Sequence, residues 1–220
     1  MKLNEYLKKI RKSRCPHDCE FKIKEKIEIA FVPPPDKILG VIISRDPTTN
    51  WLEKHYKKEK KSRKNLFDSA IPSQLIERIR NFMANNITEK DKKHISEFIY
   101  KNVYWTHLHK CFTDKSGKKS IKFKNTNANK CADKWLTEEL KTAINDNTKF
   151  IIVLGNDVKK WIYEWREDYC RNKNIEIFHL PHPSGENVGR GFSWYPKETK
   201  VREKIKNRID RLLKLCKTVV

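Results

Sequence analysis

The sequence has no apolar run long enough to cross a bilayer, and the segment from Met1 to Arg14 lacks the apolar stretch of a signal peptide. It contains only 6 glycines, and neither a Gly-x-Gly-x-x-Gly pattern nor a Walker pattern occurs. No segment repeats elsewhere in the chain. These absences argue against a membrane protein, a secreted protein and a typical nucleotide-binding enzyme.

Acidic residues are scarce, with 28 Asp and Glu against 49 Lys and Arg, which gives a net charge of +21. Such an excess favours a polyanionic partner such as nucleic acid. The alternative is a lysine-rich surface that reflects compositional bias or heat adaptation. Because nothing in the sequence directs the chain out of the cell, we expect it in the cytoplasm, associated with the nucleoid where the cell has no nucleus.

Hydrophobic residues make up only 37% of the 220 residues, but they are concentrated in a few runs that can form a core. The length fits one domain over residues 1–220, with residues 1–36 as an N-terminal arm. Short runs rich in Ile and Val predict four strands, at 37–44, 102–108, 149–154 and 175–180. Helical patterns occupy 72–85, 88–101, 128–145, 157–172 and 196–217. This alternation predicts an α/β fold with a parallel sheet.

Two of the helical segments carry finer signals. Thr88, with Asp91 three residues later, is typical of a helix N-cap. The last segment has a hydrophobic stripe, which we expect to pack on the sheet. The stripe consists of Ile205, Ile209, Leu212, Leu213 and Cys216.

Two loops follow predicted strands and carry reactive side chains. The first contains Asp46-Pro47 and the second contains Pro181-His182-Pro183. If both strands are parallel in one sheet, Asp46 and His182 reach the same carboxyl edge, where open α/β sheets bind ligands. The alternatives are a turn or cap role for Asp46 and an ordinary hydrogen-bonded loop position for His182.

These loops resemble those of the uracil-DNA glycosylase superfamily. The resemblance extends to the tail of the second loop, from Val188 to Phe192, and to Leu66-Phe67 with the Pro-Ser-Gln-Leu run that follows. It covers about 37–209. It implies a three-layer α/β/α fold with a central four-stranded parallel sheet, and a monomer that removes uracil or a related deaminated base from damaged DNA.

The resemblance also implies roles for individual residues. Asp46 would orient water near the sugar, and His182 would stabilise the leaving base. Phe67 would stack on the flipped base. Taken alone it is more typical of a core residue, and only the Pro-Ser-Gln-Leu run that follows makes the two roles even. His107 occupies the base-reading position, with a buried strand-end histidine as the alternative. The expected DNA contacts are Ser184, Asn187 and Arg190.

Three features depart from the superfamily pattern. Ser44-Arg45 replaces a glycine and a small or amide residue in the first loop, and Glu186 stands where some members have a leucine that fills the gap left by the base. His107 stands in place of an asparagine, and the two side chains present hydrogen-bonding groups of different shape. The sequence therefore does not fix which base is excised, and uracil is the default that the resemblance implies.

Four of the six cysteines are arranged in two pairs, Cys15 with Cys19 and Cys111 with Cys131. Disulfides are unexpected in the cytoplasm, whereas four thiolates suit a 4Fe–4S cluster or a structural zinc. Cluster-containing members of the superfamily carry cysteine pairs in these places, although their pairs are spaced more closely. The resemblance thus favours a structural 4Fe–4S cluster, with zinc or four unligated thiols as alternatives.

Two other functions remain open from the sequence. One is a catalytically silent member of the same fold that binds DNA or RNA. The other is an enzyme acting on a nucleotide or sugar phosphate, with Gly155-Asn156 starting a phosphate-binding helix. The lysine-rich run at 54–64 fits either a solvated surface or a DNA groove.

Overall fold

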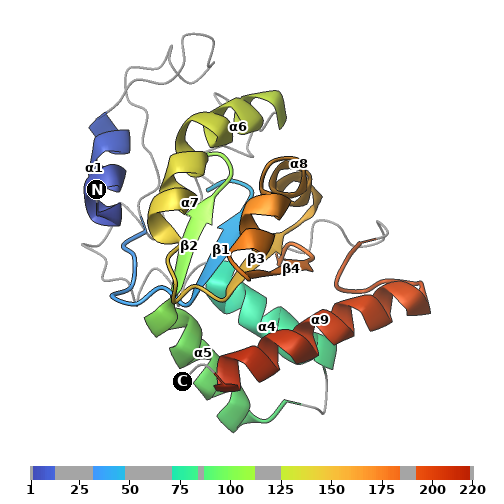
Figure 1. Cartoon of the computed structure of the whole chain (residues 1–220). Helices are drawn as coiled ribbons and strands as arrows, with labels where there is room; N and C mark the ends of the chain where they lie inside the picture. The colour runs from blue at the N-terminus through green and yellow to red at the C-terminus, as the bar shows by residue number, and fades with distance from the viewer. Residues whose placement is uncertain are drawn as a thin grey trace, which may run out of the picture.

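A central parallel sheet of four strands organises the molecule in the computed structural model, which describes residues 2–12, 32–47, 71–83, 87–111, 125–183 and 192–218. The strands are β1 (Gly40–Ser44), β2 (Val103–His107), β3 (Phe150–Leu154) and β4 (Glu176–Leu180). Their order is β2-β1-β3-β4 (Figure 1). Gly40 pairs with Val103 and with Phe150, and Phe150 pairs with Glu176. The predicted strands are confirmed, each shorter than expected.

Helices cover both faces of this sheet, which confirms the three-layer α/β/α architecture (Figure 1). One face packs against α4 (Ile71–Met83), α5 (Glu89–Asn102) and α9 (Thr199–Thr218). The other packs against α1 (Leu3–Lys12), α6 (Asn125–Cys131), the π-helical turn η4 (Ala132–Leu136), α7 (Thr137–Ala143) and α8 (Asn156–Asn172). None of the helices within the described ranges is long and apolar enough to span a membrane.

Alternation along the strands divides the core in two. In β1, Ile42 faces the α4/α5/α9 layer, whereas Val41 and Ile43 face the opposite layer. Gly40 allows the Phe150 ring to lie directly on the backbone, because a Cβ at position 40 would come within 2.2 Å of that ring. A larger residue at position 40 would therefore displace the aromatic centre of the core.

The expected helices agree with the observed ones on both layers, with one exception at 128–145. Thr88 caps α5 in a full capping box with Asp91, as predicted. The stripe on α9 is buried at Ile205, Ile209, Leu212 and Cys216, and Leu213 is partly buried against the same core. The segment expected at 128–145 begins earlier, at Asn125, and is not one continuous α-helix, because the π-helical turn η4 separates α6 from α7.

Candidate active site at the carboxyl edge of the sheet

Asp46 lies in the loop after β1. Its side chain is only 3% exposed, and its carboxylate forms an ion pair with the guanidinium of Arg45, which is 33% exposed. The loop is tied to the chain beyond β2, because the Leu108 amide donates to the Ser44 carbonyl (2.8 Å) and the His109 amide donates to the Arg45 carbonyl (2.9 Å). Asp46 is therefore held at the carboxyl ends of β1 and β2.

His182 lies in the loop after β4, at the same edge of the sheet. The Gly155 amide, just beyond β3, donates to the Leu180 carbonyl (2.9 Å). Gly155 has a φ of +85°, and a Cβ built there would lie 3.6 Å from the His182 Cβ. The indole N–H of Trp194 donates to the His182 carbonyl (3.2 Å). Since one strand separates β1 from β4, their ends are about 10 Å apart.

The loop that carries His182 is fixed at both of its described ends. On one side, Arg78 of α4 donates through Nε to the Pro183 carbonyl (3.0 Å). On the other, the Phe192 ring stacks on His179 with centroids 4.0 Å apart. Arg208 of α9 donates to the His179 carbonyl (3.0 Å) and lies over the Phe192 ring. Sequence reasoning missed Arg78, His179 and Arg208, since no local pattern indicates a contact with a distant backbone carbonyl.

His107, the expected base-reading residue, is buried at the end of β2. Burial lowers its pKa well below the usual range, and the positive charges of Lys110 and His182 lower it further. The ring is therefore neutral near pH 7 and offers one donor and one acceptor. The effect of His182 on this pKa places the two imidazoles in one neighbourhood.

His109, which sequence reasoning did not select, is also buried at this edge. Burial lowers its pKa, whereas the Asp46 carboxylate opposes that shift, so the two side chains lie within electrostatic reach. Its Nδ1 is 3.2 Å from the Cys111 carbonyl oxygen, which can only accept, so Nδ1 carries the proton. The structure thus groups Asp46, His107, His109 and His182 along one edge of the sheet. The sequence signal was a pair of histidines, one at the end of the strand and one just after it.

Cys111 and Cys131 are both buried, on the β2 side of this edge. The Lys110 amide donates to the Cys131 sulfur (3.4 Å). Cys131 is therefore in contact with the residue that precedes Cys111. Cys131 also contributes to the raised pKa of Tyr6 in α1, after burial and the carboxylates of α7. The helix that precedes Cys15 and Cys19 is therefore close to this pair. Within the described ranges no three His, Cys, Asp or Glu side chains are grouped to hold a metal.

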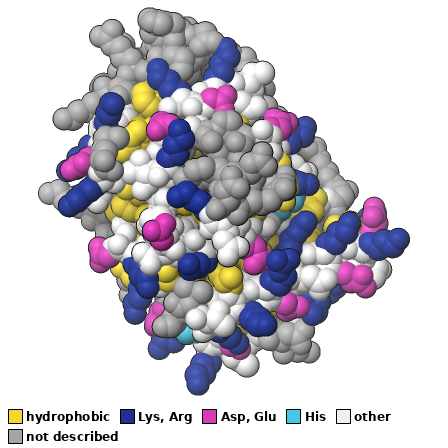
Figure 2. Space-filling model, in the orientation of Figure 1, with side chains coloured by type: hydrophobic (Ala, Val, Ile, Leu, Met, Phe, Trp, Pro, Cys, Tyr) yellow, Lys and Arg dark blue, Asp and Glu magenta, His cyan; other side chains and the backbone are white. Residues whose placement is uncertain are grey.

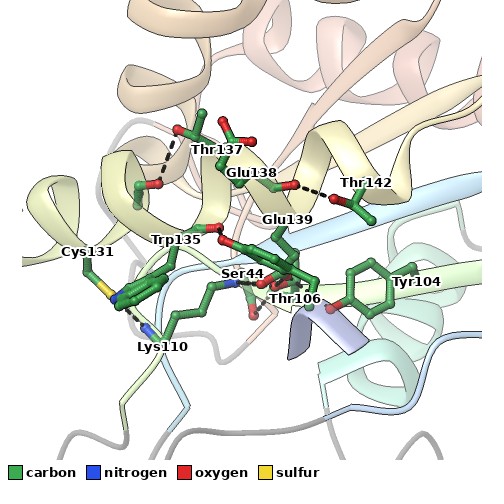
Figure 3. A network of polar contacts seen from close by, with 12 residues as sticks. Ser44, Tyr104, Thr106, Lys110, Cys131, Trp135, Thr137, Glu138, Glu139 and Thr142 are labelled. Atoms are coloured by element: carbon green, nitrogen blue, oxygen red, sulfur yellow. Dashed lines mark hydrogen bonds and ion pairs between the residues drawn. The ribbon is translucent and has the colours of Figure 1, made fainter. Parts of the chain in front are cut away.

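A buried polar network lies next to the cysteines, between β2 and α7 (Figure 3). The ammonium of Lys110 is 2.8 Å from the Glu139 carboxylate and donates to the Thr106 hydroxyl (2.6 Å). The Tyr104 hydroxyl (3.0 Å) and the Thr106 hydroxyl both donate to Glu139. Sequence reasoning missed this network. Its signal in β2 was Thr106, a polar residue that precedes His107 at the end of the strand.

The remaining expected site residues lie outside the described residues. They are Phe67, Ser184, Asn187, Arg190, Cys15 and Cys19. Their roles stay predictions, as do those of Glu186 and the lysine-rich run at 54–64.

Comparison with protein families gives a direct assignment. The family model of the uracil-DNA glycosylase superfamily matches residues 34–207. The chain belongs to this superfamily. A comparison with curated proteins finds no match. In this uracil-DNA glycosylase superfamily member, the matched range includes both loops and the whole sheet, so the buried carboxylate and the histidines lie where the family model applies.

Proposed function

We propose that the protein is a DNA glycosylase of base-excision repair, which hydrolyses the N-glycosidic bond of a deaminated base, with uracil as the first candidate. Superfamily membership supports N-glycosylase chemistry on DNA. The observation that carries the proposal is the position of Asp46 and His182 on two loops at one edge of the sheet. The net charge of +21 suits DNA as the partner.

Hydrolysis of the N-glycosidic bond has three requirements at this edge of the sheet. Extrusion of the nucleotide costs a few kcal/mol. The sugar then becomes positively charged, and Asp46 would stabilise that charge and orient the attacking water. The base departs as an anion, and His182 would donate a hydrogen bond to its oxygen. Neutral His107 would meet the base edge with one donor and one acceptor.

Further contacts are proposed for residues on the flanking segments. Phe67 would stack on the extruded base. The second loop would hold the DNA backbone through its polar side chains, and these contacts would position the strand without reading its sequence. The residues concerned are Ser184, Asn187 and Arg190.

Incubation with single- and double-stranded oligonucleotides that contain uracil, followed by alkaline cleavage at abasic sites, tests the proposal. We expect Asp46→Asn and His182→Ala to lower the rate about 10²- to 10⁴-fold. Matched controls are Asp210→Asn and His94→Ala, because both side chains are exposed on helices. Failure to release uracil, hypoxanthine or xanthine in either strand context contradicts the proposal.

A second candidate is a catalytically silent member that binds DNA or RNA. The ion pair between Arg45 and Asp46 favours it, since a carboxylate neutralised by a guanidinium stabilises a sugar cation less. This candidate predicts tight oligonucleotide binding with no abasic product, and binding that survives Asp46→Asn. Base release by the unsubstituted protein excludes it.

We also propose that Cys15, Cys19, Cys111 and Cys131 hold a 4Fe–4S cluster, with structural zinc as the alternative. Cys111 and Cys131 are both buried and lie close together, which supports a shared site. Thiolates suit both an iron–sulfur cluster and zinc. Such a group would tie the N-terminal arm to the segment between β2 and α6. Metal and sulfide analysis of anaerobically purified protein tests this.

The cysteine variants have a matched control. We expect Cys111→Ser and Cys131→Ser to lose the metal, whereas Cys216→Ser keeps it. Burial raises the pKa of Cys216 to about 12, so this thiol stays protonated. Metal-free protein after anaerobic purification contradicts the site, and zinc without sulfide selects the alternative.

We place the protein in the cytoplasm, acting as a monomer on nucleoid DNA that contains damaged bases. The basic charge supports association with DNA. Light scattering tests the monomer, and imaging of a fluorescent fusion in cells tests the association with DNA. A stable dimer in solution, or a fusion excluded from the nucleoid, would contradict these expectations.

A further inference from the structure

Tyr195 is a large aromatic side chain left in solvent, beside the loop that carries His182. Among the described residues, the exposed large aromatic side chains are Tyr195 at 55% and Tyr163 at 38%. Tyr195 directly follows two buried residues, Ser193 and Trp194. The Tyr195 side chain is therefore exposed although the residues just before it are packed into the protein.

Local contacts hold the Tyr195 backbone in place. Its amide donates to the Ser193 hydroxyl (3.3 Å). The neighbouring Trp194 packs edge-to-face on Phe82, with centroids 5.9 Å apart, and donates to the His182 carbonyl. The next residue is Pro196, which fixes its own φ. Little conformational entropy is left for this segment to lose when Tyr195 binds a partner.

Arg78 connects the Tyr195 ring to the second loop. Its Nη1 donates to the Tyr195 hydroxyl (3.1 Å), and its guanidinium carbon lies 5.9 Å from the ring centroid. The same side chain donates through Nε to the Pro183 carbonyl (3.0 Å). One arginine thus bridges the exposed ring and the residue that follows His182.

The surroundings of Tyr195 are positively charged. From residue 195 to residue 206 the chain carries five exposed basic side chains and two acidic ones. The basic residues are Lys197, Lys200, Arg202, Lys204 and Lys206. Figure 2 shows Lys and Arg side chains gathered over the start of α9, with a few acidic ones between them. This surface attracts a polyanion to the fixed ring.

We propose that Tyr195, backed by Arg78, is a stacking contact for an unpaired base of the DNA strand beside the excised nucleotide. A flat ring beside a guanidinium suits the π-face of any base, and the basic residues suit the phosphates on either side of it. DNA is favoured over an acidic protein because Arg78 links the Tyr195 hydroxyl to the loop that carries His182. The inference rests on the proposed function, since it assumes DNA as the partner.

Fluorescence anisotropy with a labelled single-stranded oligonucleotide tests this contact. We expect Tyr195→Ala to weaken binding about 5- to 100-fold, the range for loss of one stacked base. Tyr195→Phe keeps the ring and should bind within about 2-fold of the unsubstituted protein. Tyr163→Ala is the matched control, because Tyr163 is also exposed and also lies beside a basic side chain, that of Lys159. It should bind normally.

Two further measurements separate stacking from charge and from misfolding. Tyr195→Ala should leave the salt dependence of binding unchanged, whereas Lys200→Ala should reduce its slope by about one. Inorganic polyphosphate, which has no bases, should bind Tyr195→Ala and the unsubstituted protein equally. Thermal unfolding of each variant confirms that the fold is retained.

The outcomes distinguish this inference from the proposed function. If the unsubstituted protein binds no DNA, both fail. If it binds DNA and releases the base while Tyr195→Ala binds equally well, only the stacking contact is overturned. An equal loss in Tyr195→Phe and Tyr195→Ala assigns the effect to the hydroxyl bond with Arg78, and a parallel loss of polyphosphate binding assigns it to charge. Either result overturns the proposal.

Discussion

The loop after β1 and the loop after β4 leave the same edge of the sheet, but different forces hold them. Beside the first loop, a buried charge pair joins Lys110 to Glu139, with hydroxyl groups completing the network. Around the second loop, backbone carbonyls accept from Trp194 and Arg78, and aromatic rings stack. A buried charge pair leaves a large penalty when one partner is removed, whereas a bond to a carbonyl is worth much less. The side near the cysteines should therefore tolerate substitution least.

The largest effect is expected from Lys110→Met, which tests this difference between the two loops. The substitution leaves the Glu139 carboxylate buried without its ammonium, and we expect a loss of about 3–5 kcal/mol in the free energy of unfolding. The double variant Lys110→Met/Glu139→Leu should recover most of that loss, because the uncompensated charge is gone. Urea unfolding measures both. If Lys110→Met were as stable as the unsubstituted protein, the Lys110–Glu139 pair would not make the large contribution to stability that we expect.

Acidification should weaken the second loop through His179. Burial, with the charges of Lys159 and Arg208, lowers its pKa from the usual 6.5 to about 3. Between these values the unfolded chain binds a proton at His179 that the folded protein does not. The contribution of His179 to stability is therefore constant above about pH 6.5 and falls as the pH drops toward 3. The loss reaches about 1.4 kcal/mol per pH unit.

His179→Phe isolates that contribution, because it keeps an aromatic ring on Phe192 and removes the titration. Its unfolding free energy should depend on pH less steeply between about pH 3.5 and 6, by roughly one proton. The buried His107 and His109, whose pKa values are also lowered, contribute to the dependence that remains. An unchanged slope in His179→Phe would contradict this assignment.

A smaller effect is expected from Gly155→Ala. The Cβ would meet the His182 Cβ at an ordinary contact distance, so the cost comes from the φ of +85° and amounts to about 1–3 kcal/mol. Because His182 lies against this position, the substitution should raise the activation free energy of base release by more than it lowers the free energy of unfolding. Thermal unfolding and single-turnover kinetics on the same preparation compare the two. Unaltered kinetics would show that Gly155 does not help to position His182.

The smallest effect is expected from Trp194→Phe. The substitution keeps most of the packing on Phe82 and removes the bond to the His182 carbonyl, which costs about 0.5–1.5 kcal/mol. Urea unfolding compares this variant directly with Lys110→Met. A loss as large as that of Lys110→Met would overturn the proposed difference between the two loops.

Much of the layer arrangement could be predicted from residue patterns, because strands and helices leave local signals. Runs such as 149–154 are short, apolar and β-branched, and Thr88 with Asp91 marks a helix start by its own hydrogen bonds. The helix around Cys131 was placed less well, since the π-helical turn after it depends on packing against α1 and the sheet. The resemblance to the superfamily implied a four-stranded parallel sheet, whereas the order β2-β1-β3-β4 came only from the structure.

The sequence by itself determined that Asp46 and His182 each follow a buried strand, because strand period and the flanking prolines are local properties. Only the tertiary structure decided what surrounds them. Arg78 reaches Pro183 across 105 positions, and Lys110 meets Glu139 across the space between a strand and a helix. Such contacts leave no periodic trace in the chain, since they are fixed by how layers pack and by the need of buried charges and carbonyls for partners.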